Sequence, residues 1–281
     1  MKKLAALACL LMAPAISAQA SEFEPYEMAR SEVVPITEEG TDRRYELYIK
    51  LPEDYAENTD KRYPVIYATD GAIHMDTLSG TTEFLLPNVI LVCISYQLNL
   101  GAEEAHFSRF RDYTTLPSEN PEIQARYQLG QADNHFAFIR DEIIPYVEKS
   151  YRADPNERTY FGYSLGGSFG AYMPLSEPET FKNYVLGSPS FGERTAQFID
   201  DLEASTRNAQ RDIKANVFVS LGEAEEGAKD SVDDFVAVLK RRTGTGLALR
   251  DLEIIEGANH SGAFPETALR SVKWLSQLQK D

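Results

Sequence analysis

The chain contains 281 residues, with 44 acidic and 28 basic side chains, and its formal net charge at pH 7 is −16. Such a charge repels nucleic acids and anionic membranes, so neither is expected as a partner. Solubility is a sufficient explanation for the charge, and the composition leaves the oligomeric state open.

The first twenty residues, MKKLAALACLLMAPAISAQA, predict an export signal. Lys2 and Lys3 precede an apolar run, and small residues at positions 18 and 20 mark a cleavage site before Ser21. This order is typical of a secretory signal peptide, residues 1–20. The run is too short to remain as a membrane anchor, and no later segment offers about 18 uncharged apolar residues, so no stable membrane insertion is expected. We therefore expect an exported protein, periplasmic by default, with full secretion as the alternative.

Without the predicted signal peptide, 261 residues remain, and their net charge is −18 because the peptide contains two lysines and no acid. This length suits one domain with a sizeable core, residues 21–281. Cys93 is the only cysteine of that segment, which excludes an intramolecular disulfide. Since Cys93 lies inside the apolar run PNVILVCISY, we interpret it as a buried strand residue and not as a catalytic thiol.

Apolar segments suited to strands alternate with helical segments along the chain. After an extended stretch around Glu32–Ile36, the candidate strands are RRYELYIKLP, YPVIYATDG, PNVILVCISY, RTYFGYS, NYVLGSPS, ANVFVSLGE and LRDLEIIEG. Several are continuously apolar, as strands covered on both faces must be. The alternation is typical of an α/β fold with a mostly parallel central sheet and helices on both faces.

Helical spacing of apolar residues predicts a helix from about Asn134 to Lys149. Four more are expected after the later strands, one from Leu165 and the others over about Thr195–Arg207, Ser231–Arg241 and Pro265–Gln279. The region from about Leu98 to Gln131 is long, polar and rich in turn residues. A connection of this length in a compact domain is usually functional or mobile, so we interpret residues 98–131 as an insertion that forms a loop or lid over a site.

Residues 162–166, GYSLG, fit the pattern Gly-x-Ser-x-Gly between a predicted strand and a predicted helix. This is the context of a nucleophile elbow. The serine is held in a strained conformation at a tight turn, where side chains two positions away on either side would collide. We therefore predict Ser164 as the nucleophile. Because it precedes a helix, the backbone N–H of Leu165 is placed to stabilise an oxyanion.

A serine hydroxyl needs a base to become a nucleophile, and the chain has four histidines. His260 lies in GANHSG, after an apolar strand and before the final helix, where the chain order serine, acid, histidine places the base. We predict His260 as the general base. His135 is expected on the surface of its helix, and His74 follows a strand end that borders the site. His106 belongs to the polar insertion and is a candidate for contact with substrate.

The acid that orients the histidine is expected just beyond the strand ANVFVSLG, where four carboxylates are close in sequence: Glu223, Glu225, Glu226 and Asp230. A common loop geometry places the acid three residues after the glycine that ends the strand. Counted from Gly222, this rule selects Glu225, with Glu223 as the alternative. The other carboxylates are interpreted as solvated charges of an acidic protein.

A second oxyanion donor is expected in the loop after the strand YPVIYA. An Asp-Gly turn ends that strand, which places the backbone N–H of Ala72 for this role. Within the insertion, Arg109 and Arg111 are candidates for binding an anionic substrate. Ion pairs with Asp112 or with a nearby glutamate are the alternative interpretation of both arginines.

The segments LPEDY, KRYPVIYATDG, RDYT, FIRDEIIPYVEKSYR, FGYSLGGSFGAY, SPS and GANHSG, with a Gly-Glu-x-Glu turn, resemble the putative-esterase family of the α/β-hydrolase superfamily. The resemblance extends from about Tyr45 to Trp274. It implies an α/β-hydrolase fold, with Ser164 and His260 at the positions of the family's catalytic residues and Ala72 at its second oxyanion donor. The family includes siderophore esterases, feruloyl esterases, esterase D-like enzymes and mycolyltransferases, and the siderophore-esterase-like branch is the most similar. Some relatives function with a weakly placed acid or none.

We therefore predict an exported serine hydrolase that cleaves a small-molecule carboxylic ester through an acyl-enzyme on Ser164. More specific alternatives are a siderophore esterase acting on a catecholate trilactone and a feruloyl esterase. An acyltransferase with the same residues and a non-catalytic binding protein on this fold are the rival classes. No metal or organic cofactor is required, and the scattered histidines do not have metal-ligand spacing.

Overall fold

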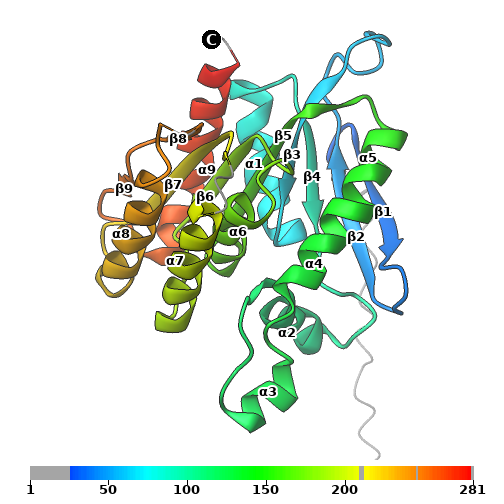
Figure 1. The fold of residues 1–281 in the computed structure, drawn as a ribbon. Helices are drawn as coiled ribbons and strands as arrows, with labels where there is room; N and C mark the ends of the chain where they lie inside the picture. The colour runs from blue at the N-terminus through cyan, green and yellow to red at the C-terminus, as the bar shows by residue number, and fades with distance from the viewer. Residues whose placement is uncertain (1–25, 209–211, 245, 280–281) are drawn as a thin grey trace, which may run out of the picture.

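The computed structural model describes residues 26–208, 212–244 and 246–279, so the predicted signal peptide lies outside the described residues. The strands form one sheet in the spatial order β1-β2-β4-β3-β5-β6-β7-β8, and β9 also pairs with β7 (Figure 1). The pairs among β3 to β9 are parallel, whereas β2 is antiparallel to both β1 and β4. The strands are β1 (Ser31–Thr37), β2 (Arg44–Lys50), β3 (Tyr63–Ala68), β4 (Ile90–Ile94), β5 (Ala153–Tyr163), β6 (Asn183–Gly187), β7 (Ala215–Gly222), β8 (Leu247–Leu249) and β9 (Glu253–Ile255).

Alternating residues of the central strands enter two apolar cores, one on each face of the sheet. Val65 and Tyr67 pack into the larger core, whereas Ile66 and Ala68 pack into the other. Two helices that contact each other, α1 (Gly71–Leu85) and α9 (His260–Leu278), close the smaller core. The opposite face is covered by α2 (Ala102–Tyr113), α4 (Ala132–Phe138), α5 (Ile144–Ser150), α6 (Leu165–Ser176), α7 (Glu193–Asn208) and α8 (Glu226–Lys240) (Figure 1). The predicted mostly parallel sheet with helices on both faces is confirmed.

The helix predicted for Asn134–Lys149 is one continuous run in three parts, in which α4 leads through a π-helical turn, η1 (Ile139–Ile143), into α5. The helices predicted after the later strands correspond to α6, α7, α8 and α9. Helix α1 was not predicted, because its glycines and threonines weaken both helix propensity and apolar periodicity. In the described part of the chain, no helix is long and apolar enough to cross a bilayer.

The insertion at residues 98–131 contains two regular helices, α2 and α3 (Pro121–Tyr127), where a loop with short helical pieces was expected. Local caps explain the difference: a proline starts α3, and the Asn120 side chain accepts two backbone N–H groups of its first turn. The loop after α2 closes on itself, because the backbone N–H of Gly130 donates to Thr114 Oγ1 at 2.8 Å. The segment from Thr114 to Gly130 is therefore a folded element with adjacent ends.

The carboxyl ends of β3, β5, β6 and β7 lie side by side in the sheet. In open α/β sheets, ligands bind outside these ends. The connections that follow the four strands carry Asp70, Ser164, Ser188 and Glu225, respectively. The fold therefore gathers residues from distant parts of the sequence at one edge.

Candidate active site

Ser164 lies between β5 and α6, at a turn with a strained backbone. Its φ and ψ angles are 57° and −121°, in a region that residues other than glycine rarely occupy. The turn is so tight that a Cβ atom on Gly162 would lie 2.2 Å from the carbonyl oxygen of Gly166. Glycine is therefore required at position 162. The strand, turn and helix of a nucleophile elbow are all present.

His260 is the first residue of α9, and its side chain faces Ser164. The distance from His260 Nε2 to Ser164 Oγ is 2.8 Å. Asn259 caps the helix, since its side-chain oxygen accepts the backbone N–H of Gly262 at 2.9 Å. The cap fixes where α9 begins and so where the imidazole lies. A base within hydrogen-bond distance of a serine hydroxyl can activate that hydroxyl as a nucleophile.

Glu225 follows β7 and contacts the other ring nitrogen of His260. Glu225 Oε2 is 2.5 Å from His260 Nδ1. The second carboxylate oxygen, Oε1, accepts the backbone N–H of Gly222 at 2.9 Å and the hydroxyl of Ser188 at 2.7 Å. The Glu225 side chain is 9% exposed, whereas the His260 side chain is 46% exposed. The carboxylate is thus held inside the protein, while the imidazole faces solvent.

The alternative acid, Glu223, has a different partner. Its Oε2 atom accepts the backbone N–H of Gly257 at 2.7 Å. Glu225 is therefore the carboxylate beside His260. Glycine is required at position 222, because a Cβ atom there would lie 2.5 Å from the carbonyl oxygen of Ala258, and the backbone N–H of Gly222 binds the carboxylate three residues further on.

The two backbone groups expected to bind an oxyanion belong to the first turns of two helices. Leu165 begins α6 and Ala72 is the second residue of α1. N–H groups in a first helical turn have no carbonyl partner within the helix and favour negative charge nearby. The two turns are in contact, since a Cβ atom on Gly166 would lie 2.4 Å from Thr69 Oγ1 and 3.1 Å from Asp70 Oδ2. Both N–H groups are therefore available at one edge of the sheet.

Arg109 connects the insertion to the loop that precedes Ala72. Its Nε atom is 2.9 Å from Asp70 Oδ1, and the hydroxyl of Tyr96 donates to the same oxygen at 2.7 Å. The pair is largely buried, with 15% of the Arg109 side chain and 3% of the Asp70 side chain exposed. Asp70 itself has a φ of 62°. The ion pair thus holds a strained turn in place, and Arg109 is paired with an aspartate of the protein itself.

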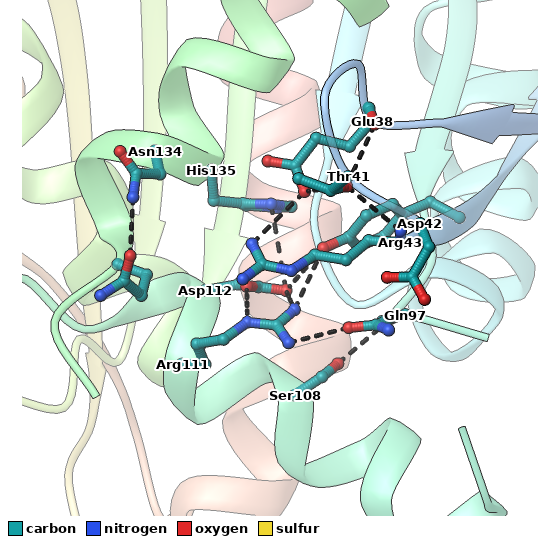
Figure 2. Close-up of polar contacts among 12 residues, drawn as sticks. Glu38, Thr41, Asp42, Arg43, Gln97, Ser108, Arg111, Asp112, Asn134 and His135 are labelled. Carbon is teal, nitrogen blue, oxygen red and sulfur yellow. Dashed lines mark hydrogen bonds and ion pairs between the residues drawn. The ribbon is translucent and has the colours of Figure 1, made fainter. Parts of the chain in front are cut away.

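Arg111 points into the protein interior (Figure 2). Its guanidinium pairs with Asp112 at 2.7 Å and donates to Gln97 Oε1 at 2.8 Å. The hydroxyl of Tyr45, in β2, donates to Asp112 at 3.1 Å. Arg111 therefore forms the ion pair that was the alternative interpretation, and this pair anchors the last turn of α2. His106 remains exposed on α2, with its ring 5.5 Å from that of Tyr96.

Two other histidines lie in the core. The expectation that His135 is on the helix surface is wrong, because it is 3% exposed and packs against the rings of Tyr113 and Phe169. His74 is also buried and stacks on Phe264 at 4.5 Å. Burial lowers the pKa of both imidazoles, so both are neutral at neutral pH. Within the described residues, no group of three His, Cys, Asp or Glu side chains is arranged to hold a metal ion.

Ser188 and Tyr163 also contact the site, and neither was singled out from the sequence. Ser188 bonds to Glu225, and the Tyr163 hydroxyl is 2.5 Å from the carbonyl oxygen of His260. The signal that could have found them is their position. Both lie where a parallel strand ends, at the edge that carries Ser164.

Comparison with known proteins identifies the family. The model of the putative esterase family matches residues 39–260. The chain belongs to this family. The esterase is accordingly a carboxylic ester hydrolase. One relative, the ferri-bacillibactin esterase of Bacillus subtilis, is 27% identical over 266 residues, which are 87% of this chain and 89% of the relative.

Solved structures of similar proteins share the fold of the esterase. The BES protein of Bacillus cereus has a TM-score of 0.79 at 21% identity, over 92% of this chain and 98% of that chain. The siderophore hydrolase EstA of Aspergillus nidulans has a TM-score of 0.71 at 19% identity, over 92% and 99% of the two chains. The sheet and helices of the esterase are of the α/β-hydrolase type.

Proposed function

We propose that the esterase is a serine hydrolase in which Ser164 is the nucleophile, His260 the general base and Glu225 the acid that orients the base. One observation carries the proposal, the continuous series of contacts from Ser164 Oγ to His260 Nε2 at 2.8 Å and from His260 Nδ1 to Glu225 Oε2 at 2.5 Å. With its Nδ1–H donated to the carboxylate, the imidazole has a free lone pair on Nε2 for the serine proton. The carboxylate then stabilises the imidazolium that forms.

The reaction proceeds through an acyl-enzyme. Attack by Ser164 on the ester carbonyl forms a tetrahedral intermediate, and the backbone N–H groups of Leu165 and Ala72 stabilise its oxyanion. His260 passes its proton to the leaving alcohol, which departs. His260 then takes a proton from water, and the resulting attack releases the carboxylic acid and restores the serine. Each of these steps uses only groups of the chain, water and the substrate.

The substrate class follows from the relatives and remains part of this proposal. The Bacillus subtilis relative is named a ferri-bacillibactin esterase, and two fungal relatives are also named siderophore esterases. A catecholate trilactone is therefore the first natural substrate to test, and feruloyl esters are the second. We also propose export, with cleavage before Ser21, which N-terminal sequencing of the processed protein would test.

The test is release of nitrophenol from short- and medium-chain p-nitrophenyl esters by the purified mature protein. Ser164→Ala and His260→Ala are expected to lower kcat about a thousandfold or more, since each removes a member of one catalytic unit. Ser231→Ala is a matched control, because Ser231 is also a half-buried serine and its hydroxyl donates only to the carbonyl of Ala228 in its own helix. Its rate is expected to stay within about twofold of wild type.

A fluorophosphonate probe separates the rival classes. Labelling that is lost in Ser164→Ala supports an activated serine, whereas a folded wild-type protein that neither reacts nor hydrolyses esters would contradict the proposal and favour a binding protein. Faster transfer of the acyl group to an added alcohol than to water would identify an acyltransferase.

A further inference from the structure

The segment that follows β6 connects the nucleophile to the acid. The backbone carbonyl of Gly187 accepts the N–H of Ser164 at 2.9 Å, and the N–H of Ser188 donates to the carbonyl of Ser220 in β7 at 2.8 Å. Further along, the N–H of Ser190 donates to the carbonyl of Ser164 at 3.2 Å. Residues 187–190 therefore lie between the strand that leads to Ser164 and the strand that leads to Glu225.

The side chain of Ser188 is directed at the acid. Its hydroxyl donates to Glu225 Oε1 at 2.7 Å, and the residue is 1% exposed. An ionised carboxylate only accepts hydrogen bonds, so the single proton of Ser188 belongs to this contact. The N–H of Gly222 donates to the same oxygen at 2.9 Å. These two donors occupy Oε1 and leave Oε2 facing His260.

Tyr163 fixes the base in the same way. Its hydroxyl is 2.5 Å from the backbone carbonyl oxygen of His260 and 3.0 Å from Ser188 Oγ. A carbonyl oxygen cannot donate, so the phenol provides the proton of the contact with His260. Burial raises the pKa of Tyr163 to about 12, and the phenol therefore keeps this proton at neutral pH. The two rings also lie side by side, with centroids 5.3 Å apart.

The backbone of Ser188 is unfavourable for a residue with a side chain. Its φ is 39°, in the left-handed region that favours glycine. The hydroxyl is nevertheless directed at the carboxylate and is almost completely buried. Position 188 is thus occupied by a residue that strains the backbone and provides a hydrogen-bond donor to the acid.

We propose that Ser188 and Tyr163 are positioning residues for the acid and the base, in which Ser188 orients the Glu225 carboxylate and Tyr163 holds the start of α9 that carries His260. This inference rests on the proposed function of Ser164, His260 and Glu225. Neither residue reacts with substrate. Ser188 keeps the carboxylate aimed at Nδ1 and Tyr163 keeps the imidazole facing the carboxylate, so their removal affects proton transfer and leaves substrate binding intact.

The decisive variant is Ser188→Gly, which removes the hydroxyl and relieves the unfavourable φ, so that the protein is expected to fold. Loss of one hydrogen bond to a charged group is expected to lower kcat roughly 10- to 100-fold, with KM within about twofold. Tyr163→Phe keeps the ring and is expected to lower kcat about fivefold.

Ser271→Ala is the matched control. Ser271 is a fully buried serine of α9, and its hydroxyl donates to the carbonyl of Ala268 within the same helix. Its kcat and its KM are expected to remain those of wild type. The rate of fluorophosphonate labelling of Ser164 gives a second readout that does not depend on the choice of ester, and Ser188→Gly is expected to slow it by a factor similar to its loss in kcat.

The outcomes separate this inference from the proposed function. If wild type is labelled and Ser164→Ala is not, while Ser188→Gly and Tyr163→Phe both keep the wild-type kcat and labelling rate, then only the positioning role is wrong. If Ser164→Ala itself retains activity, the proposed function fails first. A lowered kcat accompanied by an equally raised KM would also overturn the positioning role, because a general loss of packing would produce that result.

Discussion

Replacement of Glu225 by glutamine tests the acid directly, because it keeps the shape of the side chain and removes its charge. In the esterase, the carboxylate accepts from the backbone N–H of Gly222, the hydroxyl of Ser188 and Nδ1 of His260. A glutamine has only one oxygen to accept these bonds. Since two of the donors converge on Oε1, the amide oxygen is expected there, and the NH2 group then faces His260.

The consequence is a change of tautomer. The NH2 group of the glutamine can only donate, so the imidazole must present a lone pair on Nδ1 and carry its proton on Nε2. In that form His260 cannot accept the proton of Ser164. We therefore expect kcat of Glu225→Gln to fall about 10³- to 10⁴-fold, as for a triad that loses its correct tautomer. This corresponds to roughly 4 to 5.5 kcal/mol of transition-state stabilisation.

The assay compares initial rates of p-nitrophenyl ester hydrolysis for wild type, Glu225→Gln and Glu223→Gln. Glu223 bonds to the backbone N–H of Gly257, so its replacement is expected to change kcat by no more than about threefold. Thermal unfolding of each variant verifies that it is folded. A Glu225→Gln enzyme within tenfold of wild type, or equal losses in the two variants, would refute both the assignment of the acid and the tautomer argument.

Two further predictions concern stability. Arg109→Ala leaves the buried Asp70 without its cation. We therefore expect the free energy of unfolding to fall by about 3 kcal/mol and the Tm to fall by roughly 10 °C. Calorimetry measures the Tm, and a decrease of less than about 2 °C would contradict the prediction. Hydrogen bonds from Lys50 and Arg30 hold the pKa of Glu83 below its ordinary value of 4.5, so its stabilising effect is complete above that value and is lost as the pH falls through the lowered pKa. Glu83→Gln is therefore expected to lower the free energy of unfolding in urea by about 0.5 to 1 kcal/mol at pH 7 and by less at pH 3. An equal decrease at both pH values would disprove the linkage between the Glu83 charge and stability.

Sequence patterns were sufficient to locate residues whose geometry is fixed by residues nearby in the chain. Gly162 is needed because the elbow brings it against the carbonyl of Gly166, and this requirement is visible in five consecutive residues. The position of Glu225 beside His260 was found by counting from Gly222, whose backbone N–H binds the carboxylate. In both cases the physical constraint lies within one turn of the chain.

Features that depend on tertiary contacts could not be predicted in this way. His135 was expected on a surface, but α2 and α6 cover it, and no local pattern reports that contact. The partner of Arg109 is an aspartate 39 positions away in the chain, which only the fold brings near. Similarly, the bond between Ser188 and Glu225 joins two loops at neighbouring strand ends. Sequence patterns also underestimated the insertion, because the caps of α3 are short local signals within a polar region.

The closed loop between Thr114 and Gly130 can change in length independently of the sheet. The backbone N–H of Gly130 bonds to Thr114 Oγ1, and the N–H of Ala132 bonds to the carbonyl of Thr114 at 3.0 Å. Since the two ends are held together, a change in the length of residues 115–129 is expected to leave the sheet and the residues at its carboxyl edge in place. Exchange of this loop would therefore leave the contacts of His260 with Ser164 and Glu225 unchanged.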